Sequence, residues 1–306
     1  MNAGFGFTGA GPLLGTAALL AALLLLGRWL ERRPVRAALA IARTLPPLAV
    51  GAAALATDAQ PAGTRMLVIT AALFVAMKCL VLAAARADGE APLARRDWWS
   101  FALLWPGMAP GAFAVRGRSD RAAARRFAAR GLHNALAGAA LVLLARALGS
   151  IWLAPMLMVG LSLCVHFGLF TLLAALHRAA GRRVRPTFDA PHRSRSLGDF
   201  WAHRWNRGFA EMTALLVQRP LAARFGRKPA LLLSFLASGI LHEVAISLPV
   251  RAGYGLPTLY FVLQGALVAW LPKQHGRAVA LLAVLLPLPL VFHPPFVRGV
   301  IAPLLR

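Results

Sequence analysis

Apolar residues dominate eight long stretches of this chain, and most of its arginines lie in the segments between them. A helix needs about 20 mostly apolar residues to cross a bilayer, and each stretch approaches or exceeds that length. We therefore predict an all-α polytopic membrane protein, a bundle of about eight transmembrane helices with interfacial helices on the cytoplasmic side. The predicted spans are residues 12–30, 37–56, 66–85, 131–148, 151–176, 229–250, 255–272 and 278–297.

The composition favours a membrane protein over a soluble domain with an anchor. Of the 306 residues, 59% are hydrophobic and 14% are charged, whereas soluble domains are about one quarter charged. No positive charge precedes the first apolar stretch, so we expect a retained span rather than a cleaved signal peptide. Cys79 and Cys164 both lie in apolar stretches, which excludes a disulfide framework. We expect one integral-membrane domain over residues 1–306.

The net charge of +24 raises the question of nucleic-acid binding, but the distribution of the charge points to a membrane. Of the 34 lysines and arginines, 27 fall in alternate connecting segments. Positive charge collects on the cytoplasmic side of membrane proteins, so we predict an N-terminus outside and no nucleic-acid partner. Compact connections rich in alanine and arginine favour a bacterial inner membrane. The predicted cytoplasmic segments are residues 28–36, 86–130, 177–228 and 273–277.

Two of these segments are long and carry aromatic residues. Residues 97–110 read D-W-W-S-F-A-L-L-W-P-G-M-A-P, which is too short and too rich in proline to span, so we predict an interfacial or re-entrant piece. Residues 197–217 predict an amphipathic helix at the cytoplasmic interface, opened by a capping box that starts at Ser196. Trp201 and Trp205 are four residues apart and would share one face of that helix.

An ionisable pair, His242 and Glu243, lies inside the predicted span 229–250. Ionisable groups in hydrocarbon cost roughly 3 kcal/mol or more, and they persist where they face a protein interior or a wet cavity. Ser234 and Ser238 precede His242 at helical spacing, so the three side chains line one face. A neutral imidazole there suits a general base, and the alternative is a histidine that bonds a backbone carbonyl between helices. We expect Glu243 to pair with a cation or to bond a neighbouring helix.

Metal chemistry is not predicted. The sequence from His242 begins a zinc-protease pattern, but Ile246 stands where the second histidine ligand would be. The other histidines in spans show no ligand spacing with His242. We therefore expect no metal site.

Two motifs together resemble the membrane-bound O-acyltransferase (MBOAT) superfamily, and its wax synthase-like branch most closely. The first reads S-L-G-D-F-W-A-H-R-W-N and ends at Asn206, and the second reads S-G-I-L-H-E and contains His242. The segments L-L-W-P-G-M-A-P and Y-G-L-P-T-L-Y-F-V-L-Q-G are also similar to that family. The resemblance covers about residues 95–270. His203 is a departure, because many members have arginine at that position of the first motif.

The resemblance implies ester formation from acyl-CoA and a lipophilic alcohol, with acyl-CoA as co-substrate and no permanently bound cofactor. It implies that His242 is the catalytic histidine and Asn206 the assisting polar residue. We further expect Arg204, Trp205 and Arg207 to contact acyl-CoA, with the arginines on its phosphates and a structural role as the alternative for Trp205.

Two other functions stay open at the level of sequence. One is a non-enzymatic transporter or lipid-binding membrane protein, in which His242 and Glu243 line a polar cavity. The other is acyl transfer to a polymer or protein at the outer face, which would favour large outer connections. The predicted outer connections are short.

Overall fold

The computed structural model describes residues 4–272 and 276–305, and every regular element in those residues is helical. The prediction of an all-α, multi-pass membrane protein is therefore confirmed. Six helical segments are long and apolar enough to cross a membrane, and they contain the first six predicted spans. The predicted connection 273–277 lies mostly outside the described residues. The six segments are Ala10–Leu30, Val35–Ala56, Ala62–Ala87, Arg121–Leu148, Ile151–Ala179 and Arg227–Val250.

The last two predicted spans differ from the prediction. Helix α14 (Leu256–Trp270) has only 15 residues and begins directly after Gly255, whose φ of 88° is incompatible with a continuing helix. The stretch predicted as 278–297 is helical but broken at residues 292–293. Pro294 disfavours the helical conformation of the residue before it, which accounts for the break.

The helices form two compact units. The first contains residues up to 92, 213–269 and 287–303, and the second contains residues 93–212, 270–286 and those from 304. The first unit has helices α1 (Ala10–Leu30), α2 (Val35–Ala56), α3 (Ala62–Ala87), α11 (Arg219–Phe225), α12 (Arg227–His242), α13 (Leu248–Val250), α14 (Leu256–Trp270), α16 (Leu288–Val291) and α17 (Pro294–Phe296). The second has α4 (Arg95–Leu104), α5 (Gly111–Ala114), α6 (Arg121–Leu148), α7 (Ala154–Ser162), α8 (Phe170–Ala179), α9 (Leu197–Asp199), α10 (Arg207–Thr213) and α15 (Gly276–Leu285). Turns of π-helix occur at Leu163–Leu169, Phe200–Arg204, Ala214–Gln218, Glu243–Ser247 and Val297–Ile301.

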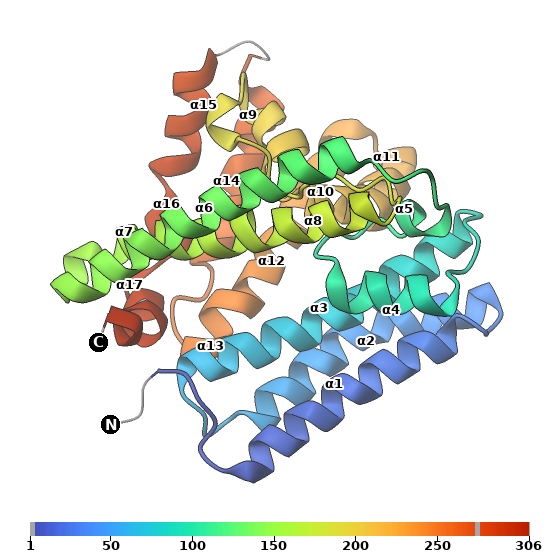
Figure 1. The fold of residues 1–306 in the computed structure, drawn as a ribbon, viewed down its shortest axis with the longest axis horizontal. Coiled ribbons are helices and arrows are strands. Elements are labelled where there is room, and N and C mark those ends of the chain that lie inside the picture. The colour runs from blue at the N-terminus through green and yellow to red at the C-terminus, as the bar shows by residue number, and fades with distance from the viewer. Residues whose placement is uncertain (1–3, 273–275, 306) are drawn as a thin grey trace. The chain divides into compact units, whose positions relative to one another are not determined.

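Within the first unit, α1, α2 and α3 run side by side (Figure 1). Small residues at the contact let helix backbones approach closely, which is a common basis for helix packing in membranes. Helix α2 presents such residues at spacings of four and seven, so they lie along one stripe facing α3. The alanines of this core are Ala38, Ala42, Ala49, Ala53, Ala72, Ala76 and Ala83.

Within the second unit, α6 and the segment α7–α8 form a helical hairpin (Figure 1). Gly149 ends α6 with a φ of 63°, the left-handed conformation in which many helices terminate. A Cβ atom on Gly138 of α6 would lie 2.6 Å from the carbonyl oxygen of Gly160 of α7. The two backbones therefore touch, and glycine is required at this crossing.

The aromatic segment 97–110 packs into the protein. Helix α4 has 10 residues and is too short to span, as expected, and its interfacial or re-entrant placement stays a prediction. Trp98 and Phe101 are fully buried in the protein, and Trp105 and Phe113 pack on the ring of His177. These four aromatic residues therefore belong to the core of the second unit, whereas Trp99 is only partly buried.

An ion-pair network holds this segment in place. Asp97 accepts hydrogen bonds from Arg182 at 2.5 Å and from Arg116 at 3.0 Å. Arg182 also donates to Nδ1 of His177, whose Nε2 lies 3.1 Å from the carbonyl oxygen of Leu104. Burial alone would raise the pKa of Asp97, but the hydrogen bonds from Arg182 and Arg116 outweigh it and hold the pKa below its ordinary value.

Candidate active site

His242 is the last residue of α12 and directly precedes the π-helical turn Glu243–Ser247. Its Nδ1 lies 2.7 Å from the carbonyl oxygen of Ser238, one turn earlier in the same helix. Because a carbonyl only accepts hydrogen bonds, Nδ1 carries the proton, and the lone pair of the neutral ring is on Nε2. The carbonyl bond is thus made within the helix and not between helices. It orients the nitrogen that is able to take a proton.

Phe261 of α14 supports the imidazole. The ring centroids of His242 and Phe261 are 4.1 Å apart, with the planes inclined by 33°. Phe261 is buried, so its position is fixed by the surrounding core. Sequence reasoning did not single out Phe261, because one phenylalanine in an apolar helix carries no distinguishing signal.

The small and hydroxyl residues before His242 allow α12 and α14 to lie close together. A Cβ atom on Gly239 would be 2.7 Å from the Cα atom of Thr258 in α14. Ser234 and Ser238 are buried on the same helix, as the helical spacing predicted. The glycine of S-G-I-L-H-E therefore has a packing role, which is to bring α14 and Phe261 up to His242.

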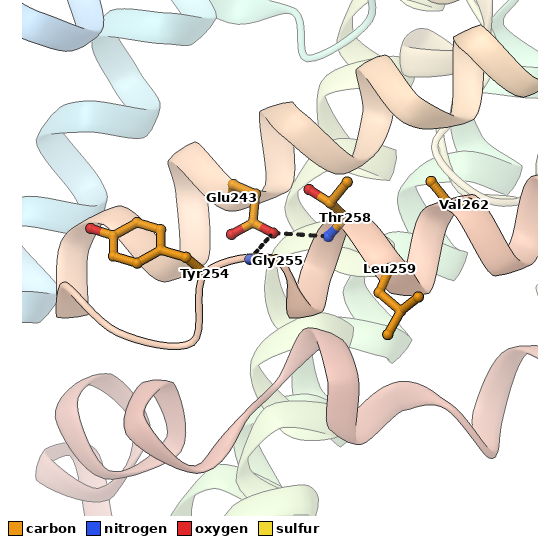
Figure 2. A pocket seen from close by; sticks show the side chains of 6 residues that line it. All are labelled: Glu243, Tyr254, Gly255, Thr258, Leu259 and Val262. Atoms are coloured by element: carbon orange, nitrogen blue, oxygen red, sulfur yellow. Dashed lines mark hydrogen bonds between the residues drawn. The ribbon is translucent and has the colours of Figure 1, made fainter.

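Glu243 binds the start of α14 and not a cation. Its Oε1 accepts hydrogen bonds from the backbone N–H groups of Gly255 at 2.9 Å and Thr258 at 3.0 Å (Figure 2). The first N–H groups of a helix lack partners inside the helix, and a carboxylate there also balances the helix dipole. The alternative that Glu243 bonds a neighbouring helix is therefore the one the geometry supports. Its Oε2 is buried and has no hydrogen-bond partner among the described residues.

A groove of about 450 Å³ opens beside this carboxylate (Figure 2). Its lining surface is mostly apolar and includes Leu259 and Val262 of α14, and such a surface suits a hydrocarbon chain. The residues that line it are Glu243, Tyr254, Gly255, Thr258, Leu259 and Val262.

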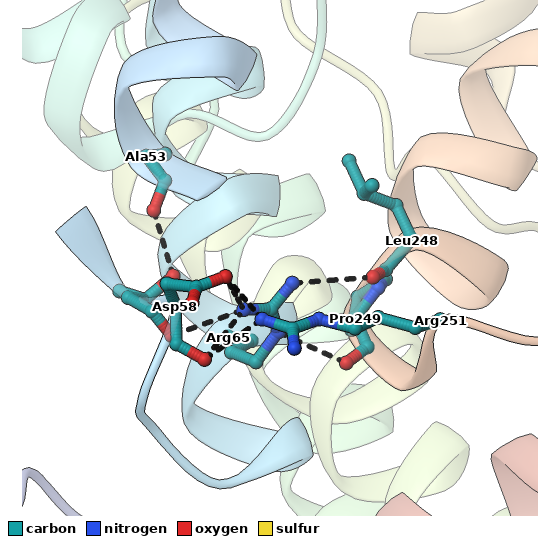
Figure 3. Close-up of polar contacts among 7 residues, drawn as sticks. Ala53, Asp58, Arg65, Leu248, Pro249 and Arg251 are labelled. Carbon is teal, nitrogen blue, oxygen red and sulfur yellow. Dashed lines mark hydrogen bonds and ion pairs between the residues drawn. The ribbon is translucent and has the colours of Figure 1, made fainter. Parts of the chain in front are cut away.

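Arg65 fixes the far end of the same span. The guanidinium is buried and donates to the carbonyl oxygens of Pro249 at 3.0 Å and Leu248 at 3.4 Å (Figure 3). It also donates to the carbonyl oxygens of Thr57 and Asp58, in the turn before α3. The last carbonyls of a helix lack partners inside the helix, so an arginine is well suited to cap them. Arg65 thereby anchors the span that carries His242 to α3.

The first motif starts with Ser196 as the predicted N-cap, and the reciprocal bond of the capping box is shifted to the residue before it. Oγ of Ser196 accepts a hydrogen bond from the N–H of Asp199, and Oδ2 of Asp199 accepts one from the N–H of Arg195. Nε of Arg204 lies 2.7 Å from Oδ2 of Asp199 and forms an ion pair with it. Burial would raise the pKa of Asp199, but the bonds from Arg204 and Arg195 lower it overall. The carboxylate therefore stays charged and ties the two ends of this turn together.

The continuous helix predicted over residues 197–217 is wrong. The helical turn ends at Arg204, Trp205 is extended with φ −103° and ψ 118°, and Asn206 takes a left-handed φ of 44°. Asparagine tolerates that conformation better than most residues. Its Oδ1 then accepts a hydrogen bond from the N–H of Phe209 at 3.2 Å, at the start of α10. With the carbonyl end of the amide engaged, Nδ2 is the end that donates.

Trp201 and Trp205 consequently do not share a helix face. Trp205 stacks on Phe200, with ring centroids 5.6 Å apart and planes inclined by 12°. It also meets Phe188 edge to face at 5.1 Å, and Trp201 meets Phe200 edge to face at 5.0 Å. The geometry of Trp205 matches the structural alternative, a side chain that packs the loop before Asn206.

The predicted site residues fall in both units. His242 lies in the first unit, whereas Arg204, Trp205, Asn206 and Arg207 are consecutive residues of the second. Arg204 is paired with Asp199, and Arg207 lines a pocket rich in arginine.

Part of the chain, including both motifs, is similar to membrane-bound acyltransferases. Residues 184–263, which include both Asn206 and His242, match the membrane bound O-acyl transferase family. The resemblance predicted from the sequence, to that superfamily and its wax synthase-like branch, is confirmed.

Individual relatives are similar over part of the chain. The probable long-chain-alcohol O-fatty-acyltransferase 9 of Arabidopsis thaliana is 29% identical over 152 residues, which are 42% of this chain and 45% of the relative. The long-chain-alcohol O-fatty-acyltransferase of Simmondsia chinensis is 31% identical over 130 residues, 38% of this chain and 37% of the relative. The matched part thus spans less than half the length of each relative.

Proposed function

We propose that the protein is an O-acyltransferase that transfers an acyl group from acyl-CoA to the hydroxyl of a lipophilic alcohol, with a long-chain alcohol as the default acceptor. The observation that carries the proposal is the hydrogen bond from Nδ1 of His242 to the carbonyl of Ser238. It leaves the lone pair of a neutral imidazole on Nε2, inside the segment that matches the family.

The reaction follows from that tautomer. Nε2 of His242 takes the proton of the alcohol as the alcohol oxygen attacks the thioester carbonyl carbon, and the carbonyl electron pair moves to oxygen. When the carbonyl re-forms, the carbon–sulfur bond breaks and the CoA thiolate leaves. The imidazolium returns its proton to that sulfur. The products are an ester and free CoA. Exclusion of water by the bilayer protects the thioester from hydrolysis.

Asn206 is assigned the assisting role. An oxyanion of this kind is stabilised by donors that are held in place before the reaction. The bond from the N–H of Phe209 holds the side-chain oxygen of Asn206, which supports Nδ2 as the donor to the thioester oxygen.

Arg204, Trp205 and Arg207 are assigned to acyl-CoA. Arginine guanidinium groups bind phosphates in bidentate fashion, and Arg204 and Arg207 flank Asn206 within two residues. Trp205 would shape the loop between them. In this assignment the loop is cytoplasmic, since CoA is charged and water-soluble, and the membrane is a bacterial inner membrane with the N-terminus outside.

The experiment is an ester-formation assay on membranes that contain the protein. Labelled long-chain acyl-CoA and acetyl-CoA are offered with a panel of lipid alcohols, beside a His242→Ala variant of equal abundance. We expect a new ester with the unaltered protein and a loss of at least 100-fold in the variant. Full activity of a folded His242→Ala protein would refute the mechanism, and no ester with any pair would refute the function.

A further inference from the structure

The second unit contains a pocket of about 370 Å³ whose lining is strongly basic. None of the lining residues belongs to the first motif, although Arg207 directly follows its last residue, Asn206. The pocket is lined by one acidic residue, Asp189, and by five arginines, which are Arg126, Arg130, Arg178, Arg185 and Arg207.

Helix α6 supplies one wall by its periodicity. Ala123, Arg126, Phe127 and Arg130 all line the pocket, and their spacings of three, four and seven put them on one helix face. Arg125 is exposed on a different face of the same helix and does not line the pocket. Arg126 and Arg130 therefore line the pocket because of the helix face on which they lie. The general positive charge of the segment does not account for this placement.

The charge of the lining is only partly balanced within the protein. Arg130 pairs with Asp189 at 2.8 Å, and Arg178 pairs with Asp120 at the start of α6. Over residues 4–272 and 276–305, the other three arginines of the lining make no ion pair. Glu211, one turn beyond Arg207, attracts it electrostatically without forming a close contact. Guanidinium groups held together in one pocket repel each other, and an anion would relieve that repulsion.

The pocket is attached to the first motif. The N–H of Arg207 donates to the carbonyl oxygen of Thr187 at 2.8 Å, and the N–H of Asp189 donates to that of Arg204 at 2.9 Å. Phe188, between these two bonds, packs on Trp205. The wall of the pocket and the loop that carries Asn206 are therefore one hydrogen-bonded structure.

We propose that this pocket is a binding site for a phosphate ester that carries two or more negative charges. Guanidinium groups match phosphate oxygens bidentately, and several converging arginines favour a multiply charged ligand over a single carboxylate. Such a phosphate has two sources, the nucleotide end of the acyl donor or the headgroup of an anionic lipid. The nucleotide source rests on the function proposed above, whereas the phosphate site does not.

The test uses two double variants of the full chain in lipid nanodiscs. Arg126→Gln with Arg185→Gln removes two exposed arginines of the lining that make no ion pair. Arg125→Gln with Arg183→Gln is the matched control, because both residues are exposed neighbours that do not line the pocket. Binding of coenzyme A is measured in phosphatidylcholine discs by calorimetry. Retained phosphatidylglycerol is counted by mass spectrometry after purification from mixed lipid. Thermal melting checks that each variant folds.

The outcomes separate the two sources. A tenfold or greater loss of coenzyme A affinity in the lining variant, with less than twofold in the control, supports a nucleotide site. Unchanged coenzyme A affinity with a threefold or greater loss of retained phosphatidylglycerol supports a lipid-headgroup site. Equal behaviour of the two double variants in both assays overturns the proposal.

Two further variants keep the result interpretable. If the glutamine variant does not fold, Arg126→Lys with Arg185→Lys keeps the charge but loses the bidentate geometry, and a three- to tenfold loss of phosphate-ligand affinity is expected. Unchanged affinity for both ligands in the lysine variant would then overturn the site. His242→Ala should abolish ester formation and leave coenzyme A affinity unchanged. An active His242→Ala protein would therefore refute the proposed mechanism without touching the pocket.

Discussion

Oε1 of Glu243 lies 3.0 Å from the backbone nitrogen of Thr258 and accepts its hydrogen bond. The residue next to the proposed base thus fixes the start of the helix whose Phe261 lies against the imidazole. The two adjacent ionisable residues therefore have different roles. His242 is assigned the proton transfer, and Glu243 positions the helix that supports it.

Glu243→Ala should lower both stability and activity. The substitution leaves the N–H groups of Gly255 and Thr258 without their acceptor, which costs about 1–3 kcal/mol. Glu243→Gln keeps an acceptor oxygen, so its loss of unfolding free energy should be less than half of the loss in Glu243→Ala. Thermal melting and kcat of ester formation check this order. Equal melting temperatures for the alanine variant and the unaltered protein would contradict the capping role.

Asn206→Asp separates the two tasks of the amide. Aspartate keeps the oxygen that accepts from Phe209 and is a good helix cap, so the melting temperature should not fall. It replaces the proposed Nδ2 donor with an acceptor, so kcat should fall roughly 100-fold. An Asp variant with normal kcat would assign Asn206 to structure alone.

Gly239→Ala should separate α12 from α14. The new Cβ would lie 2.7 Å from Cα of Thr258, which is backbone and cannot move aside as a side-chain tip does. Overpacking of this kind costs about 1–3 kcal/mol. Gly51→Ala in α2 is the control, because nothing lies within 4 Å of its Cβ position. The melting temperature should fall for the first variant and stay level or rise for the second.

Arg65→Lys tests the anchor at the end of the span. Lysine keeps the charge, but a single ammonium cannot reach four carbonyl oxygens on two segments, so a loss of about 1–3 kcal/mol is expected. Asp58→Asn should change stability by less than about 0.5 kcal/mol, because the Asp58 side chain is 71% exposed. A larger effect of Asp58→Asn than of Arg251→Gln, which removes the other ion-pair partner of Asp58, would show that the ion pair holds Arg65.

Asp97→Asn should destabilise the second unit in a pH-dependent way. The pKa of Asp97 is depressed in the folded protein, so its contribution is complete above the ordinary pKa of about 3.9 and is lost as the pH falls through the folded value. Removal of one partner from a buried ion pair costs about 3 kcal/mol or more. The melting temperatures of the Asp97→Asn variant and the unaltered protein should differ most near pH 7 and converge below about pH 4. A difference that stays constant down to pH 3 would contradict the electrostatic role.

The long apolar helices were predictable because their signal is local. Each of the first six spans follows from length and hydrophobicity alone, and the face shared by Ser234, Ser238 and His242 follows from helical geometry. The break at Asn206 was not predicted, since the four-residue spacing of Trp201 and Trp205 agrees with a continuous helix. The helix ends at Arg204 because Trp205 is extended and Asn206 is left-handed, and both residue types are also compatible with a helix.

Contacts between segments that are distant in the sequence could not be predicted from the residue pattern. The acceptor role of Glu243 depends on Gly255 turning the chain so that α14 starts beside it. The arginine-lined pocket combines α6, the end of α8 and the loop before Asn206. Arg126 and Arg130 are one helical turn apart, so the wall of the pocket that α6 forms follows from the sequence. The identity of the loop that forms the opposite wall does not.

The contacts of Arg65 also bear on how the chain is made. Arg65 and Pro249 are 184 residues apart, so α3 is synthesised well before its partner span exists. At about 5–20 residues per second, the delay is roughly 10–40 s. During that time the local partners of the guanidinium are the carbonyls of Thr57 and Asp58 and the carboxylate of Asp58. The carbonyls of Leu248 and Pro249 can complete its coordination only after the later span has been made.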